Sequence, residues 1–345
     1  MNAACHSLLI LLVALAGHAQ ETDQGFPLVP IRQDAHPDVL TITADLQHQT
    51  VAAGDPRPGV VAWQRLPAYT GTEVGHTVYL PPTWVSGRTY PVVVEYLGNT
   101  AKVRDLRSIG YPLCVDQEMI WVVLPFIAAD RTTDTPMWWG DVAATVAYAK
   151  EAVPAICAAW GGDPTRVALV GSSRGGIACN YIGLHDDDIA RLWCAMIIVS
   201  HYDDMHVPWG MTPEEQHAAP ERVKRLGRTP QLIVGEHTTS PQPWEDTGLR
   251  QQIAAQNLDT FATAKAALKL VPIVQYEKTR VFLRQHCPHG NVTFMDLPWV
   301  NHGSASWLRE TPERQAVRAW LAKTLGTGGP SAAPIPRSTP GAKQP

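Results

Sequence analysis

The residues best suited to chemistry in this sequence form a Gly-x-Ser-x-Gly pentad centred on Ser173. A short apolar run precedes the pentad, and a stretch of small residues follows it. Gly171 and Gly175 allow a sharp strand-to-helix turn, which strains the serine backbone and lifts its hydroxyl above a sheet. The same turn places the backbone N–H of Arg174 beside the hydroxyl, as a donor to an oxyanion. The pattern predicts a nucleophilic serine at position 173.

A serine nucleophile needs a base to take its proton and an acid to orient that base. On a doubly wound sheet these follow in the order Ser, Asp or Glu, His. His302 fits the base, because it follows an apolar strand at residues 292–297 and precedes the last helix. The chain has thirteen histidines, and an ordinary surface-loop histidine is the alternative interpretation.

The sequence leaves the acid open. Thr238 occupies the position after the strand at residues 231–234 where an aspartate is usual. Glu236 is the nearest carboxylate, and its extra methylene could compensate for the shift in position. Asp203, which follows the strand at residues 195–200, is the alternative acid.

Two further groups could contact a substrate. The loop after the strand at residues 91–97 contains Gly98, which allows close backbone approach, and Asn99, whose N–H is the predicted second oxyanion donor. An ordinary strand-ending turn is the alternative. Trp138 and Trp139 lie at the predicted carboxyl edge of the sheet, where ligands bind, and are predicted to form an apolar or sugar-stacking wall. Burial of one indole in the core remains the alternative.

No metal or cofactor is expected. The clusters at residues 201–206 and 286–289 contain His, Asp and Cys but lack the spacing of a ligand set. The side chain of Arg174 could hold an anionic substrate group or pair with a structural carboxylate. Cys157, Cys179 and Cys194 lie in apolar segments and are interpreted as packing residues, with any disulfide pairing left open.

The elements around these residues predict an α/β fold. Short apolar runs alternate with helical segments, and their near-continuous Val, Ile and Leu content indicates strands that are covered on both faces. We therefore expect a doubly wound, mostly parallel sheet with flanking helices. Asp141 is the predicted cap of a helix that ends at Gly161, and Thr311 begins the final helix. The other predicted strands are residues 74–80 and 119–124 and the run that enters the pentad.

Composition divides the chain into segments. Residues 1–19 resemble a signal peptide, which predicts a secreted or periplasmic protein. Residues 20–58 form a predicted irregular leader, and residues 59–325 the main domain, with residues 247–290 as a possible cap over the pocket. Residues 326–345 are rich in Gly, Pro and Ser and are expected to be disordered.

The bulk properties limit the classes of partner. The net charge is −4 and no basic patch recurs, so nucleic acid is not expected as a partner. After the signal peptide we expect no membrane span. The oligomeric state is not determined by the sequence.

Four segments carry a family resemblance: residues 78–82, residues 88–94, the pentad and the region of His302. Together they resemble the α/β-hydrolase superfamily over about residues 60–325, and in particular secreted esterases of the polyhydroxybutyrate-depolymerase and feruloyl-esterase kind. The resemblance implies an α/β-hydrolase fold and an acyl-enzyme route for cleaving a small-molecule or polymer-borne ester without a cofactor.

The chain also departs from that family. Leu97-Gly98-Asn99 replaces the usual His-Gly oxyanion motif, and Thr238 replaces the usual aspartate. A peptidase on the same fold, or a silent binding protein that has lost its acid, is the alternative function.

Overall fold

The computed structural model describes residues 22–23, 26–203, 211–239, 248–289 and 291–327. The predicted signal peptide and nearly all of the predicted disordered tail lie outside these residues.

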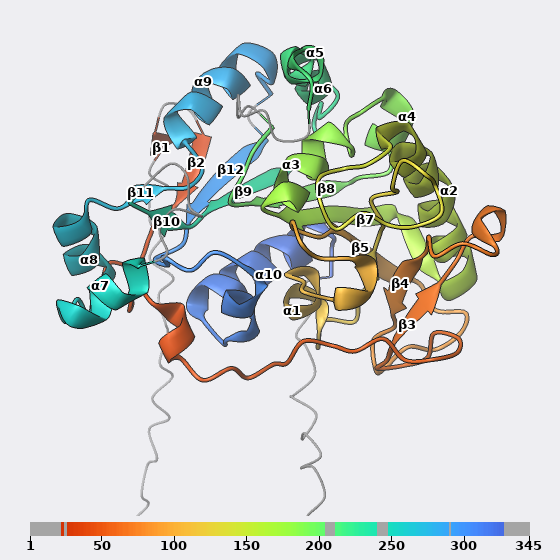
Figure 1. Cartoon of the computed structure of the whole chain (residues 1–345), viewed down its shortest axis with the longest axis horizontal. Helices are drawn as coiled ribbons and strands as arrows, with labels where there is room; N and C mark the ends of the chain where they lie inside the picture. Colours follow the sequence, from red (N-terminus) through yellow and green to blue (C-terminus); the bar gives the residue numbers. More distant parts are fainter. Residues whose placement is uncertain (1–21, 24–25, 204–210, 240–247, 290, 328–345) are drawn as a thin grey trace, which may run out of the picture.

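One large sheet organises the described part of the chain. Its strands are β1 (Thr22–Asp23), β2 (Phe26–Val29), β3 (Val61–Gln64), β4 (His76–Tyr79), β5 (Tyr90–Tyr96), β6 (Ile120–Val123), β7 (Gly162–Ser172), β8 (Ala195–Val199), β9 (Gln231–Gly235) and β12 (Val292–Asp296). They lie in the order β1-β2-β12-β9-β8-β7-β5-β6-β4-β3 (Figure 1). The strands from β2 to β6 in this order are parallel, whereas β1, β3 and β4 pair antiparallel. The pair β10 (His237–Thr238) and β11 (Val271–Pro272) is separate.

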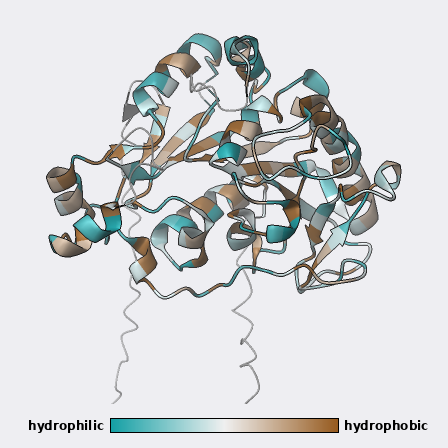
Figure 2. Cartoon of the chain, in the orientation of Figure 1, coloured by the Kyte–Doolittle hydropathy of each residue, from teal (hydrophilic) through white to brown (hydrophobic). Residues whose placement is uncertain are grey.

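Helices cover both faces of this sheet. They are α1 (Gly110–Cys114), α2 (Val142–Trp160), α3 (Arg174–Tyr181), α4 (Asp187–Ala190), α5 (Pro213–His217), α6 (Ala219–Lys224), α7 (Leu249–Ala255), α8 (Phe261–Leu268), α9 (Tyr276–His286) and α10 (Pro312–Thr324). Figure 2 shows the sheet as the hydrophobic centre of the molecule, with mixed colouring on the helices.

Alternation along the strands explains the two layers. In β5, Val92 and Val94 join the apolar cluster that contains residues of α2 and α3. Their neighbour Val93 joins a second cluster with residues of α1 and α10. Successive side chains of a strand point to opposite faces, so an uninterrupted apolar run needs a helix layer on each side. The predicted doubly wound, mostly parallel sheet with flanking helices is confirmed.

The helix α2 is the main helix before the pentad strand. Asp141 caps it by accepting a hydrogen bond from Ala144 N at 2.9 Å, and Gly161 ends it with a left-handed φ of 72°. Length and composition alone would allow α2 to cross a membrane, but half of its apolar window is buried inside the protein. Because α2 packs against β7, we interpret it as a core helix.

The leader is more ordered than the sequence indicates. Within residues 20–58, β2 adds a parallel strand beside β12, with Leu28 opposite Phe294. The guanidinium of Arg314 in α10 pairs with Asp45 at 2.7 Å. The run Phe-Pro-Leu-Val is too short to be recognised as a strand from its pattern, and its order comes from the edge of β12 that it covers.

The segment predicted as a cap, residues 247–290, contains α7, α8, β11 and α9. Part of it forms a small apolar cluster of its own around Phe261. The five cysteines among the described residues are free thiols, and Cys157 and Cys179 are buried as expected of packing residues, whereas Cys194 is partly exposed.

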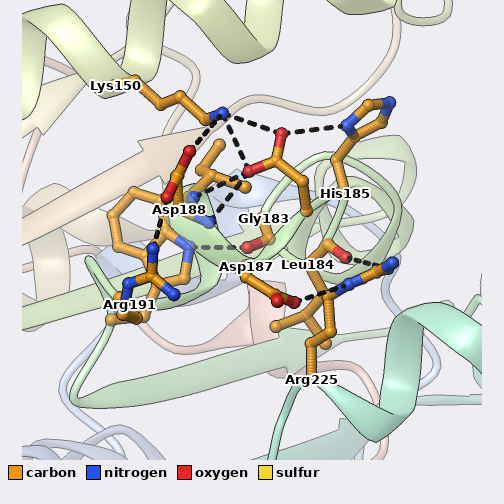
Figure 3. A network of polar contacts seen from close by, with 11 residues as sticks. Lys150, Gly183, Leu184, His185, Asp187, Asp188, Arg191 and Arg225 are labelled. Atoms are coloured by element: carbon orange, nitrogen blue, oxygen red, sulfur yellow. Dashed lines mark hydrogen bonds and ion pairs between the residues drawn. The ribbon is translucent and has the colours of Figure 1, made fainter.

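A polar network links α2, which precedes the pentad, to α4 and to the end of α6, which follow it (Figure 3). Lys150 of α2 reaches Asp188 at 3.6 Å, and Arg225 reaches Asp187 at 3.1 Å and the carbonyl of Leu184 at 3.1 Å. Exposed ion pairs of this kind each contribute little stability. None of these residues lines the cavity described below, so we assign the network no role there.

The close packing of α3 on the sheet yields a stability prediction. A Cβ placed on Gly175 would lie 1.9 Å from the carbonyl oxygen of Tyr96, which is backbone and cannot move aside. Gly175→Ala should therefore lower the free energy of unfolding by roughly 1–3 kcal/mol or more.

Thermal unfolding followed by circular dichroism would measure this loss. Gly248→Ala is the matched control, because the nearest atom to its Cβ is a flexible glutamine nitrogen at 3.9 Å. Equal midpoints for the two variants would contradict the packing argument.

Candidate active site

The turn between β7 and α3 holds Ser173 in a strained conformation. Its φ of 57° and ψ of −126° lie in a region that side-chain-bearing residues rarely adopt. The backbone N–H of Ser173 donates to the carbonyl of Val199 at 3.0 Å, and its carbonyl accepts from Gly176 N at 2.9 Å. These bonds anchor the turn to β8 through Val199 and to the first turn of α3 through Gly176.

A cavity of about 660 Å³ opens above this turn, and both Ser173 and His302 line it. The ring of His302 lies 3.1 Å from Glu236, measured from Nδ1 to Oε2. Because an ionised carboxylate only accepts, Nδ1 must carry the proton, and Nε2 is then the basic nitrogen. The structure thus brings the predicted nucleophile and base to one cavity and places Glu236 against the base.

The carboxylate of Glu236 is fully buried. Its Oε2 accepts from Ser200 Oγ as well as from His302. Ser200 directly follows β8 and lies three positions before Asp203, the alternative acid. Its contribution was not recognised from the sequence, because a serine after a strand has no distinguishing pattern.

Asp203, the alternative acid, lies in a different contact. Its two oxygens accept from Arg222 Nε at 2.7 Å and from Nη2 at 3.0 Å, and both side chains are buried. A two-bond pair of this kind neutralises the carboxylate locally. The geometry therefore favours Glu236 as the acid.

The leader supports the loop that carries His302. Asn301, directly before it, donates to Asp38 Oδ1 at 3.0 Å and accepts from Val39 N at 2.9 Å. Arg250 of α7 holds the other oxygen of Asp38 at 2.6 Å. The two buried bonds of Asn301 join segments more than 260 positions apart, so the orientation of the histidine loop depends on the leader.

The charge of Glu236 shifts the titration of His302. Desolvation lowers the pKa of His302, but the hydrogen bond and negative charge of Glu236 outweigh it and raise that pKa above 6.5. His201 lies with its ring centre 5.5 Å from that of His302. Burial, together with the charge of His302, lowers the pKa of His201 to about 3, so His201 is neutral near pH 7.

Both residues that are predicted to supply oxyanion donors line the cavity with Ser173. Arg174 is the first residue of α3, where a backbone N–H has no acceptor within the helix. A Cβ on Gly98 would lie 3.5 Å from that of Ser173, so the loop holding Asn99 is packed against the candidate nucleophile. Asn99 also lines the cavity.

The two tryptophans have different environments. Trp138 lines the cavity, whereas Trp139 is fully buried and packs on Tyr181 with ring centres 4.8 Å apart. Only Trp138 of the predicted pair can contact a substrate in this cavity.

The predicted cap segment does not line this cavity: among the described residues of 247–290, none contributes to the wall. Residues of α7 instead line a second cavity of about 640 Å³ on the other side of the His302 loop.

The side chain of Arg174 does not form the structural ion pair that was one of its two sequence interpretations. It lies within ion-pair distance of no carboxylate in the described part of the chain, and its nitrogens donate to backbone carbonyls.

Glu95 is a buried carboxyl of the cavity wall that was not recognised from the sequence. It accepts from Ile109 N and Trp121 Nε1 at 2.9 Å, from Gly110 N at 3.1 Å and from Ser108 Oγ. Burial raises the pKa of Glu95 to about 7 although these hydrogen bonds lower it.

Among the residues that the structure describes, no three His, Cys, Asp or Glu side chains gather as a metal site would require.

The topology and the turn together decide the fold family. A strained serine follows the carboxyl end of a central parallel strand, and Ser173, Glu236 and His302 occur in that order along the chain, as in α/β hydrolases. The chain has the α/β-hydrolase fold.

No protein-family model matches the sequence, and no curated protein matches it either. Solved structures with a similar arrangement include the metagenomic carboxylesterase EstE1, with 15% identity and a TM-score of 0.49 over 80% of this chain and 92% of that one. A ferulic acid esterase is 13% identical, with a TM-score of 0.45 over 77% and 98%. A thermostable esterase is 15% identical, with a TM-score of 0.43 over 76% of this chain, which spans only 62% of that protein. At these identities the likenesses concern the fold alone.

The pair of His302 and Glu236 predicts a specific titration. Glu236→Gln removes the negative charge and should lower the pKa of His302, as measured by NMR of the imidazole protons. In the wild type the pair should contribute stability that is complete below pH 6.5 and is lost as the pH rises through the raised pKa.

Asp203→Asn provides the control for this measurement. It should lower the thermal midpoint, because it breaks a buried pair with Arg222, yet leave the titration of His302 unchanged. A His302 pKa that moves in D203N and not in E236Q would show that the assignment of the acid is wrong.

Proposed function

We propose that the protein is a serine hydrolase that cleaves a carboxylic ester through an acyl-enzyme intermediate. The observation that carries the proposal is the contact of His302 with the buried carboxylate of Glu236, at the wall of the cavity that Ser173 enters. The silent-binder alternative rested on a missing acid, and the position of Glu236 removes that reason.

The residues suggest a role for each group. The Oγ of Ser173 attacks the ester carbonyl carbon while its proton passes to Nε2 of His302. The N–H groups of Arg174 and Asn99 hold the negative oxygen that forms. The carbon–oxygen bond then breaks, and the alcohol leaves with the proton of His302. Water, activated by the same nitrogen, hydrolyses the acyl-enzyme and restores the serine. Glu236 orients the imidazole and stabilises the imidazolium.

The proposed substrate is a small-molecule or polymer-borne ester. Trp138 provides an apolar wall for its acyl or aromatic group. The signal-peptide pattern of residues 1–19, which lie outside the described residues, supports export to the periplasm or the medium.

A fluorophosphonate probe tests the nucleophile. The wild type should be labelled at Ser173, and Ser173→Ala should lose both the label and ester turnover, the latter by up to about a million-fold. Mass spectrometry of the labelled peptide locates the adduct. Ser86→Ala, in an exposed turn, is the control and should label like the wild type. A folded wild type that takes no label would disprove the proposal.

Matched substrates test the choice of ester over amide. We expect the protein to hydrolyse acyl esters, since an alcohol is expelled from the tetrahedral intermediate more readily than an amine. Release of product from an ester and from the anilide of the same acyl group is followed by absorbance. Anilide hydrolysis above the background of Ser173→Ala would favour the peptidase alternative.

A further inference from the structure

The guanidinium of Arg174 is a buried cation beside the nucleophile, and the residue is only 2% exposed. Nη1 donates to the carbonyl of Trp138 at 2.6 Å, and Nη2 to that of Gly98 at 3.0 Å. Longer contacts from Nη2 reach the carbonyls of Leu97 at 3.5 Å and Ala101 at 3.4 Å. One side chain therefore joins two separate loops to the first residue of α3.

Burying this cation has a large desolvation cost. Removing a guanidinium from water costs several kcal/mol unless dipoles or charges replace the solvent. Here carbonyl dipoles do so, together with the face of Phe126, whose ring centre lies 4.2 Å from the guanidinium carbon. Desolvation lowers the pKa of Arg174 to about 9, while Asp134 opposes the shift, so the side chain stays charged at pH 7. An apolar residue would fill the space without this cost, which indicates a positional role.

The two loops that Arg174 joins are themselves strained. Thr100 has a φ of 62° and Trp138 a φ of 52°, both in the left-handed region, where a non-glycine residue costs about 1–2 kcal/mol. The carbonyls that Arg174 contacts belong to Trp138 itself and to residues on either side of Asn99 and Thr100. Asn99 adds a cross-link, since its Oδ1 accepts from Trp138 N at 3.2 Å.

We propose that Arg174 is a positioning residue, whose side chain holds the loop of residues 97–101 so that the N–H of Asn99 meets the oxyanion. The inference rests on the proposed hydrolase function and goes beyond it. It also accounts for the sequence of this loop, because Leu97-Gly98-Asn99 lacks the histidine of the usual motif and gains its support from the residue after the nucleophile. The backbone N–H of Arg174 keeps its separate role as the other donor.

Arginine suits this position in a way that lysine does not. Its planar fork donates in two directions and so reaches Trp138 and Gly98 together. A lysine ammonium retains the buried charge but is a single point, which can reach one loop at a time. The pair Arg174→Lys and Arg174→Met thus separates the charge from the bridge between the loops.

The experiment measures kcat and KM per active site, with active sites counted by the fluorophosphonate burst. Both variants keep the backbone donor at position 174. We expect kcat to fall by roughly 10²–10³-fold in Arg174→Met, as for loss of one oxyanion donor, with KM nearly unchanged. Affinity for a trifluoromethyl ketone, whose adduct carries the oxyanion, should fall in parallel. Arg174→Lys should fold and show the same direction with a smaller loss.

Arg318→Met is the matched control. Arg318 is also a buried cation bonded to a backbone carbonyl, that of Pro112 at 2.8 Å, but it lies on α10, away from the cavity. Its loss should lower the thermal midpoint without changing kcat per active site.

Three results would overturn the inference. One is an unchanged kcat per labelled site in either folded Arg174 variant. Another is a rise in KM alone, which would make Arg174 a substrate-binding group. The third is a fall in kcat per labelled site that Arg318→Met shows as well when its thermal midpoint drops by the same amount, because the loss would then report stability alone. If the wild type itself takes no label, the proposed hydrolase function fails instead, so the two failures are distinguishable.

Discussion

The site depends on the close approach of α3 to the sheet at the turn that holds Ser173. Helix and strand meet there without side chains between them, because Gly171 and Gly175 present only backbone. This contact forces the positive φ of Ser173, directs its side chain away from the packed interior and exposes the first N–H of α3. The surrounding sheet supplies the rigidity that maintains so strained a residue.

Parallel strand order then brings the other groups to the same place. β5, β7, β8, β9 and β12 are neighbours in the sheet and run in one direction, so the loops after them emerge at one edge. Those loops carry Asn99, Ser173, Ser200, Glu236 and His302. Residues separated by about two hundred positions in the chain therefore meet around one cavity.

Buried ionisable groups around this cavity are held by hydrogen-bond partners of complementary polarity. Glu236 accepts from Ser200 and His302, Glu95 accepts from four donors, and Arg174 donates to carbonyls of two loops. Each group would be costly to bury alone, and each gains its position from the bonds that offset this cost. The bonds of Arg174 join the loop of residues 97–101 to the loop of Trp138, and the bonds of Asn301 to Asp38 and Val39 join the histidine loop to the leader.

The sequence by itself predicted most of the strands and helices around the site and the position of the candidate nucleophile. The pentad in its strand-to-helix setting and the near-continuous apolar strands are local patterns, because a backbone turn and two-sided burial each require particular residue types nearby. The tertiary structure alone decided which carboxylate meets His302, that Trp138 and not Trp139 faces the cavity, and that Arg174 bonds to loop carbonyls. Those outcomes depend on the pairing of distant segments: α6 brings Arg222 to Asp203, whereas Glu236 contacts His302. Such contacts leave no periodicity or motif in the chain, since neither partner constrains the residues next to it.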